Sequence, residues 1–297
     1  MWKITLMILV LAVVCGCGAG KKLVAEQQAA NRLFYEKKYD SAATAYQNVI
    51  ARYEEKNISA PAEIYASAGK SLYYSGKEKE GIDNIYKAEC MGYDDELSLI
   101  MKIKYYGKID NHSKELDNLE KYQTMYHDGE EMQYVNIRLF KRYMQMSEYK
   151  KAQKAYEQIN DPEASEVEML EQYHTALTKN GEKAKADQIA EKIFHADPVN
   201  FIGLNYMART CFDKAETAYV AAIKEYEAKK TNAAYRTMVQ KTKPLLEEYK
   251  KAKTYYLKLY SLYKRPIDAE ILSRIFSRLN DKKNAELYEK LSKSKSQ

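Results

Sequence analysis

The chain has 297 residues, of which 45% are hydrophobic and 30% charged, with a formal net charge of +6. That hydrophobic content is enough to bury a core, and that much charge argues against a protein that crosses a membrane many times. Only 11 glycines and 5 prolines interrupt the chain, and no convincing period-two alternation occurs. We therefore expect an all-α protein with long helices.

The chain begins with a short apolar run that resembles a secretory signal. Lys3 is followed by uncharged residues from Ile4 to Val14, whereas a helix needs roughly 20 apolar residues to cross the hydrocarbon core. A basic start, a short apolar core and small residues follow one another in the order of a signal peptide. We assign residues 1–16 to such a signal and exclude them from the fold.

The stretch "VCGC", residues 14–17, resembles a bacterial lipobox, with an aliphatic residue three positions before Cys17 and Gly16 directly before it. The resemblance implies cleavage before Cys17, which would carry a diacylglycerol and hold the chain on membrane lipid. Cys15 fits less well because bulky Val14 precedes it. Each buried methylene contributes about 0.8 kcal/mol, so two or more chains give stable anchoring. An ordinary secretory signal with an incidental cysteine is the alternative.

Residues 17–23 would then be the lipidated cysteine and a short tether. No Asp follows Cys17 to suggest inner-membrane retention by the rule known for some bacteria. We expect a lipid-anchored protein of the bacterial envelope, at the outer membrane and facing the periplasm. In a bacterium with one membrane, the same anchor would place the protein on the cell exterior.

Four stretches of the chain align without gaps: "YDSAATAYQNVI" from Tyr39, "YKKAQKAYEQIN" from Tyr149, "FDKAETAYVAAI" from Phe212 and "YKKAKTYYLKLY" from Tyr249. Each has an aromatic residue, Ala three positions later and Tyr four after that, which places the three on one helix face. Weaker copies lie between them. The small-residue position recurs about every 35 residues, at Ala42, Gly81, Glu115, Ala152, Ala186, Ala215, Ala252 and Ala285.

This pattern resembles the tetratricopeptide repeat, a helix-turn-helix unit whose second helix carries Ala and an aromatic residue at this spacing. The stretches 67–77 and 202–212 fit its first helix. The resemblance implies an α-α superhelix of about seven to eight repeats over residues 24–291. Two departures predict irregular packing: the charged Glu115, and a short interval that suggests a shortened first helix near Phe201. The residues expected to pack within the repeats are Tyr39, Ala42, Tyr46, Gly81, Ala88, Tyr149, Ala152, Tyr156, Ala186, Phe212, Ala215, Tyr219, Tyr249, Ala252 and Tyr256.

Stacked helix pairs form a concave surface that suits an extended segment or a helix of a partner protein. The register places these candidates on it: Gln27, Asn31, Lys70, Tyr73, Ile137, Lys141, Glu171 and Thr175. Some tetratricopeptide proteins clamp a peptide carboxylate with a Lys and an Asn four residues apart; Gln27 and Asn31 lack the cation. We expect an envelope scaffold that binds another protein. The alternative is a lipoprotein that captures glycans or nutrients for an outer-membrane transporter, although such proteins are usually longer and use tryptophan.

No catalytic or metal-binding motif is found. The four histidines do not pair at a spacing of three or four residues, and no phosphate-binding loop or nucleophile elbow occurs. We therefore expect no enzyme activity, cofactor, metal or nucleic-acid partner.

The C-terminal part, residues 231–297, is basic, with 16 Lys and Arg against 7 Asp and Glu. It could meet acidic lipid headgroups, a polyanion or an acidic protein, or form a solvated face. We expect a disordered tail at residues 292–297.

Overall fold

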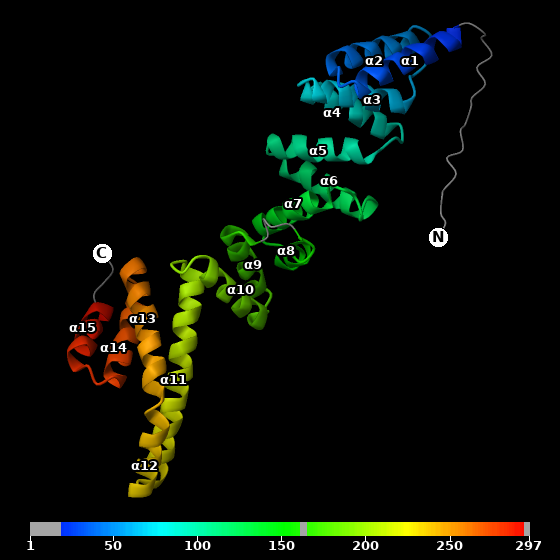
Figure 1. Ribbon diagram of the computed structural model, residues 1–297. Coiled ribbons are helices and arrows are strands. Elements are labelled where there is room, and N and C mark those ends of the chain that lie inside the picture. The colour runs from blue at the N-terminus through cyan, green and yellow to red at the C-terminus, as the bar shows by residue number, and fades with distance from the viewer. Residues whose placement is uncertain (1–18, 161–164, 294–297) are drawn as a thin grey trace. The chain divides into compact units, whose positions relative to one another are not determined.

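The computed structural model describes residues 19–160 and 165–293, and within these ranges all regular structure is helical (Figure 1). The expected all-α fold of helix-turn-helix units is confirmed. The predicted signal peptide and Cys17 lie outside the described residues. The chain divides into two compact units, residues 1–142 and 143–297, which are described separately below.

Unit 1 contains the first six helices and most of the seventh. Residues 19–23, expected to belong to a tether, are part of the first helix, in which Leu23 is buried. The helices are α1 (Ala19–Tyr35), α2 (Tyr39–Glu54), α3 (Ala62–Tyr74), α4 (Glu78–Cys90), α5 (Glu96–Lys108), α6 (His112–Met125) and α7 (Met132–Gln145).

Unit 2 begins within the last turn of α7 and continues to the C-terminal end. The last helix extends to Lys293, so the first two residues of the expected tail are helical. The helices are α8 (Tyr149–Tyr156), α9 (Val167–Lys179), α10 (Lys183–Ala196), α11 (Phe201–Lys229), α12 (Asn232–Thr242), α13 (Leu245–Tyr263), α14 (Pro266–Arg278) and α15 (Lys282–Lys293).

One turn geometry recurs inside the helix pairs. A residue with positive φ lies two positions before the second helix of each of six pairs, at Lys37, Gly76, Asp110, Ser147, Gly181 and Asn280. The amide of the following residue donates to the carbonyl five positions back; Lys77 to Leu72 and Asp281 to Phe276 are examples. This left-handed cap satisfies carbonyls at the end of a helix and reverses the chain. The two units are therefore built from the same helical hairpin.

Within a hairpin, small residues permit close contact between the two helices. A Cβ atom added to Gly81 of α4 would lie 2.7 Å from the carbonyl oxygen of Gly69 in α3 and 2.7 Å from the amide nitrogen of Tyr73. Real Cβ atoms do not approach backbone that closely. The α3–α4 crossing thus requires glycine on both helices.

The charged residue in the repeat pattern, Glu115, is completely buried in α6. Arg138 and Arg142 of α7 donate hydrogen bonds to its carboxylate. A buried carboxylate needs a paired cation and hydrogen bonds to offset its desolvation, and α7 supplies both. The irregularity expected at this position is a polar contact between neighbouring hairpins.

The expected helix-turn-helix at residues 202–223, with a shortened first helix near Phe201, is wrong. Residues 201–229 form one continuous helix, α11, and neither proline nor glycine interrupts the chain between Arg209 and Lys229. Ala215 is consequently in the same helix as the stretch expected to be its partner. The antiparallel partner of α11 is α13, and α12 lies along the distal end of α11 (Figure 1).

The residues expected to pack within the repeats lie mostly in the core. Four of them, Tyr39, Tyr149, Tyr156 and Tyr219, are half-buried. The others are buried: Ala42, Tyr46, Gly81, Ala88, Ala152, Ala186, Phe212, Ala215, Tyr249, Ala252 and Tyr256.

Candidate functional site

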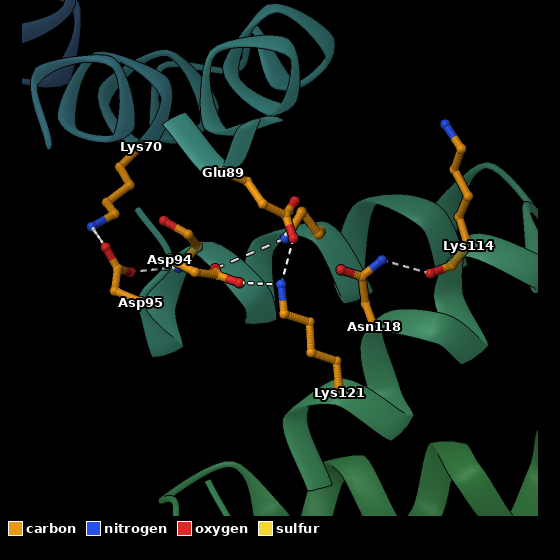
Figure 2. A network of polar contacts seen from close by, with 9 residues as sticks. Lys70, Glu89, Asp94, Asp95, Lys114, Asn118 and Lys121 are labelled. Carbon is orange, nitrogen blue, oxygen red and sulfur yellow. Dashed lines mark hydrogen bonds and ion pairs between the residues drawn. The ribbon is translucent and has the colours of Figure 1, made fainter. Parts of the chain in front are cut away.

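The polar residues of unit 1 are largely occupied by one another. Lys121 of α6 contacts both Glu89, at the end of α4, and Asp94, in the α4–α5 loop (Figure 2). Lys102, only 2% exposed, lies 2.8 Å from Glu89. Burial tends to raise the pKa of Glu89, but hydrogen bonds from the two lysines outweigh it and lower that pKa. These ion pairs join consecutive hairpins, with two lysines balancing two carboxylates.

The eight concave-surface candidates all lie on first helices of hairpins: Gln27 and Asn31 on α1, Lys70 and Tyr73 on α3, Ile137 and Lys141 on α7, and Glu171 and Thr175 on α9. Several of them make intramolecular contacts.

Asn31 accepts a hydrogen bond of 2.7 Å from the hydroxyl of buried Tyr46. Lys70 pairs with Asp95 (Figure 2), and Ile137 is buried. Glu171 accepts a hydrogen bond from Asn200. These four side chains stabilise the hairpins, and none of the eight candidates lines the hollows described next.

Unit 2 contains two adjoining hollows along the first half of α11. The first, of about 530 Å³, is lined by α9, α10 and α11, with His174, Asp187 and Phe201 among its residues. The second, of about 670 Å³, is lined by α11, α13 and α14, with Tyr256 and Ile271 among its residues. The two share Asn205, Arg209 and Asp213. We name this surface the α11 trough.

Asn205, Arg209 and Asp213 follow one another at four-residue intervals, so they form a single row on α11. Arg209 and Asp213 are exposed, and their side chains lie 3.9 Å apart. A pair so exposed contributes little to stability. Both side chains are therefore available to a bound ligand.

The second hollow is shaped by Arg265, the residue before α14. Its Nε donates to Oδ2 of completely buried Asp268 at 2.8 Å, and its Nη2 donates to Oδ1 of Asn205 at 3.1 Å. The guanidinium also lies 4.4 Å from the ring centre of Phe201. This planar group thus fixes the first turn of α14 against α11.

At the other end of the second hollow, Glu216 receives hydrogen bonds from three donors. The hydroxyl of Tyr249 donates at 2.5 Å, and Arg278 of α14 donates through Nε and Nη2 at 3.1 and 2.7 Å. Burial tends to raise the pKa of Glu216, but the bonds from Arg278 and Tyr249 lower it overall. The carboxylate is therefore ionised at neutral pH and holds α11, α13 and α14 together.

In the first hollow, burial lowers the pKa of His174, and the charge of Asp187 opposes this shift only partly. The imidazole is therefore neutral at pH 7. A neutral histidine both donates and accepts a hydrogen bond, so it can recognise backbone amides of an extended peptide. Ile202 and Phe201 add apolar surface.

The described ranges contain no cluster of three or more His, Cys, Asp or Glu residues that could hold a metal ion. Cys90 and Cys211 are free thiols, and burial raises the pKa of the Cys211 thiol, which favours its unreactive form. None of the helices from residue 19 onward is sufficiently long and apolar to span a bilayer.

The trough residues are not among the candidates predicted from the sequence, because the first half of α11 was expected to form a helix pair with its second half. The four-residue spacing of Asn205, Arg209 and Asp213 was visible as a polar row on a helix. Nothing in the sequence brought Arg265 and Asp268, about 60 positions later, to the same surface.

Comparison with known proteins gives no sequence family. No protein-family profile matches the chain, and no curated protein sequence does. Among solved structures, the chain is similar to YrrB, described as a TPR protein with an unusual peptide-binding site, with 13% identity over 63% of this chain and 92% of that one and a TM-score of 0.46.

A tetratricopeptide repeat protein from Parabacteroides merdae is similar over 86% of this chain and 100% of its own, with 16% identity and a TM-score of 0.42. The C-terminal part of a TPR repeat-containing protein from Cytophaga hutchinsonii is similar over 89% and 99%, with 16% identity and a TM-score of 0.38. With similarities this low, the class of the protein rests on its own recurring hairpins and caps. It is an all-α protein of repeated helical hairpins with open surface hollows.

Proposed function

We propose that this protein is a non-catalytic interaction scaffold of the bacterial envelope, related to tetratricopeptide proteins, that binds an extended segment of a partner protein in the α11 trough. The observation that supports this function is the continuity of the two hollows through Asn205, Arg209 and Asp213. A row of exposed polar groups next to apolar surface suits peptide backbone and mixed side chains. Acylation of Cys17 would anchor the scaffold in the outer membrane, facing the periplasm.

Site-specific crosslinking in cells tests the trough. A photoreactive amino acid at position 209 is expected to capture a discrete partner, whereas the same residue at Lys192, exposed on α10 outside both hollows, is expected to capture none. Asn205→Ala should weaken the capture from position 209. Equal yields from positions 209 and 192, or capture insensitive to Asn205→Ala, would contradict peptide binding in the trough.

Metabolic labelling with a fatty acid tests the anchor independently. Cys17→Ser should abolish the label and release the protein from the membrane fraction, while Cys15→Ser should leave both unchanged. Labelling that persists in Cys17→Ser would exclude Cys17 as the acylated residue and leave the trough proposal standing.

A further inference from the structure

The part of α11 from Tyr219 onward, all of α12 and the first two residues of α13 form an arm, residues 219–246, that has almost no core of its own. Ala222 is the one buried residue of α11 beyond Tyr219, and α12 buries none of its 11 residues. Isolated helices shorter than about 12–15 residues are marginal in water. Packing with a further element would therefore stabilise the arm.

The contacts within the arm are few. The rings of Tyr226 and Tyr235 meet edge to face with centroids 5.8 Å apart. Lys241 lies 2.5 Å from Glu225, with both side chains at least half exposed. An aromatic pair contributes about 0.5–1.5 kcal/mol, and an exposed ion pair contributes about 0–1 kcal/mol. These contacts align the two helices but do not cover their apolar side chains.

An apolar stripe is left uncovered on the arm. Tyr235, Val239 and Leu246 are spaced by four and seven residues, which places them on one helix face. Lys243 and Pro244, between α12 and α13, keep right-handed helical dihedrals, so this face continues across the junction. The three side chains are 52%, 40% and 39% exposed. Contiguous exposed apolar residues are typical of interaction sites.

The stripe borders a hollow of about 270 Å³ at the base of the arm. Its apolar lining comes from Tyr219, Val239, Leu246 and Tyr249, and Lys243 and Arg278 add positive charge. Arg278 is bound to Glu216, whereas Lys243 has no carboxylate partner among the described residues. The hollow therefore fits an apolar side chain from a partner that has acidic groups beside it.

The charge of the arm points to the same partner. Residues 219–246 contain six Lys and Arg against two Glu, and one of those glutamates, Glu225, is already paired with Lys241. Arg236 and Lys243, seven residues apart, run along the border of the apolar stripe. Basic residues beside an apolar face complement a helix with an apolar face and acidic borders.

We propose that the arm docks an acidic amphipathic helix of a partner protein, which packs against α11 and α12 as a third helix and inserts an apolar side chain into the hollow lined by Val239 and Leu246. This helix-in-groove contact uses a surface separate from the α11 trough, so its failure would not affect the function proposed above.

The probe is a fluorescent peptide of about 18 residues, long enough for five helical turns, with Leu on one face and Glu on both borders. A second peptide replaces every Glu with Lys, and a third replaces the Leu residues with Ser. Fluorescence anisotropy with the full chain should show binding of the acidic amphipathic peptide at least about tenfold tighter than of either analogue, a difference of about 1.4 kcal/mol.

Variants then locate the contact. Val239→Asp should weaken binding of the acidic peptide by about tenfold or more. Leu246→Ser, at the same hollow, should also weaken it. The double variant Arg236→Glu with Lys243→Glu should reverse the preference toward the Lys peptide. There are two matched controls. Val24→Asp changes a valine of α1 that is 55% exposed, against 40% for Val239. Lys229→Glu with Lys230→Glu makes the same charge change at the tip of the arm.

Equal affinity for the Glu and Lys peptides, or binding unaffected by both Val239→Asp and Leu246→Ser, would overturn the proposal. Two other results would also overturn it. In the first, the protein binds phosphatidylglycerol vesicles but not the acidic peptide, and Val239→Asp abolishes the vesicle binding. This result would assign the arm to a membrane. In the second, the protein self-associates but does not bind the peptide, and Val239→Asp abolishes the self-association. This result would assign the arm to contact with a second copy of the chain.

Discussion

Arg142 and Glu115 form a buried ion pair between α7 and α6, with Nε of the arginine donating to Oε2 of the glutamate at 2.6 Å. Arg138, one turn earlier, donates to the other carboxylate oxygen at 2.7 Å. Gly107 of α5 leaves room for the Glu115 carboxylate, because a Cβ atom on Gly107 would lie 3.0 Å from Oε1 of Glu115. A position that elsewhere in the chain holds a small residue thus holds a carboxylate neutralised by the next hairpin.

Glu115→Ala, although it restores the usual small residue of the repeat, should destabilise unit 1. The change leaves Arg142, whose side chain is 8% exposed, buried without its carboxylate. Breaking a buried ion pair by removing one partner costs about 3–5 kcal/mol. Urea unfolding, with amide exchange in α6 and α7 as a local measure, tests this expectation. Asp117→Ala, at an exposed position of α6, should change stability by less than about 0.5 kcal/mol. Equal stabilities of the two variants would contradict it.

Gly81→Ala should destabilise the α3–α4 hairpin, even though alanine is the better helix former by about 1 kcal/mol. The new methyl group would overlap backbone atoms of Gly69 and Tyr73, and overpacking of this kind costs about 1–3 kcal/mol. Thermal and urea unfolding measure the change. Glu80→Ala, one residue earlier and exposed, is the control and should be nearly neutral. A Gly81→Ala variant more stable than wild type would show that the helices can separate at no cost.

Arg265→Lys should destabilise unit 2 and weaken capture in the trough. Arg265 donates to both carboxylate oxygens of Asp268, through Nε and Nη2, and also to Asn205. A lysine cannot make all three bonds, and Asp268 is completely buried. We expect a loss of about 1–3 kcal/mol, the cost of leaving a buried polar group incompletely bonded. Arg274→Lys, in the same hollow but 47% exposed and 3.7 Å from Glu270, should be close to neutral. Similar losses in both variants would argue against a special role for the Arg265 fork.

The stability of unit 2 should fall in acid partly through Glu216. Its folded-state pKa is lower than the ordinary value of 4.5, so the carboxylate contributes stability that is fully present above that ordinary value. This contribution is lost as the pH falls through the folded-state pKa.

Glu216→Gln should therefore be less stable at pH 7, by about 1–3 kcal/mol for the weakened charge-assisted bonds, and should lose less stability than wild type on acidification. Urea unfolding from pH 7 to pH 3 measures both effects. Glu227→Gln, exposed on the same helix, should retain the wild-type acid dependence. Parallel curves for wild type and Glu216→Gln would contradict the assignment.

The sequence by itself determined the helices and the faces on which they pack. Ala42, Ala152 and Ala252 are all fully buried, because a spacing of three and four residues acts within one helix and needs no distant partner. The turn within a hairpin is also determined locally. A left-handed residue such as Gly76 or Asn280 ends the first helix, because its amide and the next one donate to the last carbonyls of that helix.

The tertiary structure alone decided which polar residues are buried and where surfaces remain open. In the sequence, Glu115 departs from the repeat pattern, and only the folded chain shows that Arg142 pairs with it. Arg265 bonds to Asn205, which lies 60 residues earlier in the chain. The tertiary structure also decided that α11, which continues past Phe212, pairs with α13. A local pattern specifies one helix face, whereas a hollow or a buried ion pair requires side chains from two or three helices that meet only when the chain is folded.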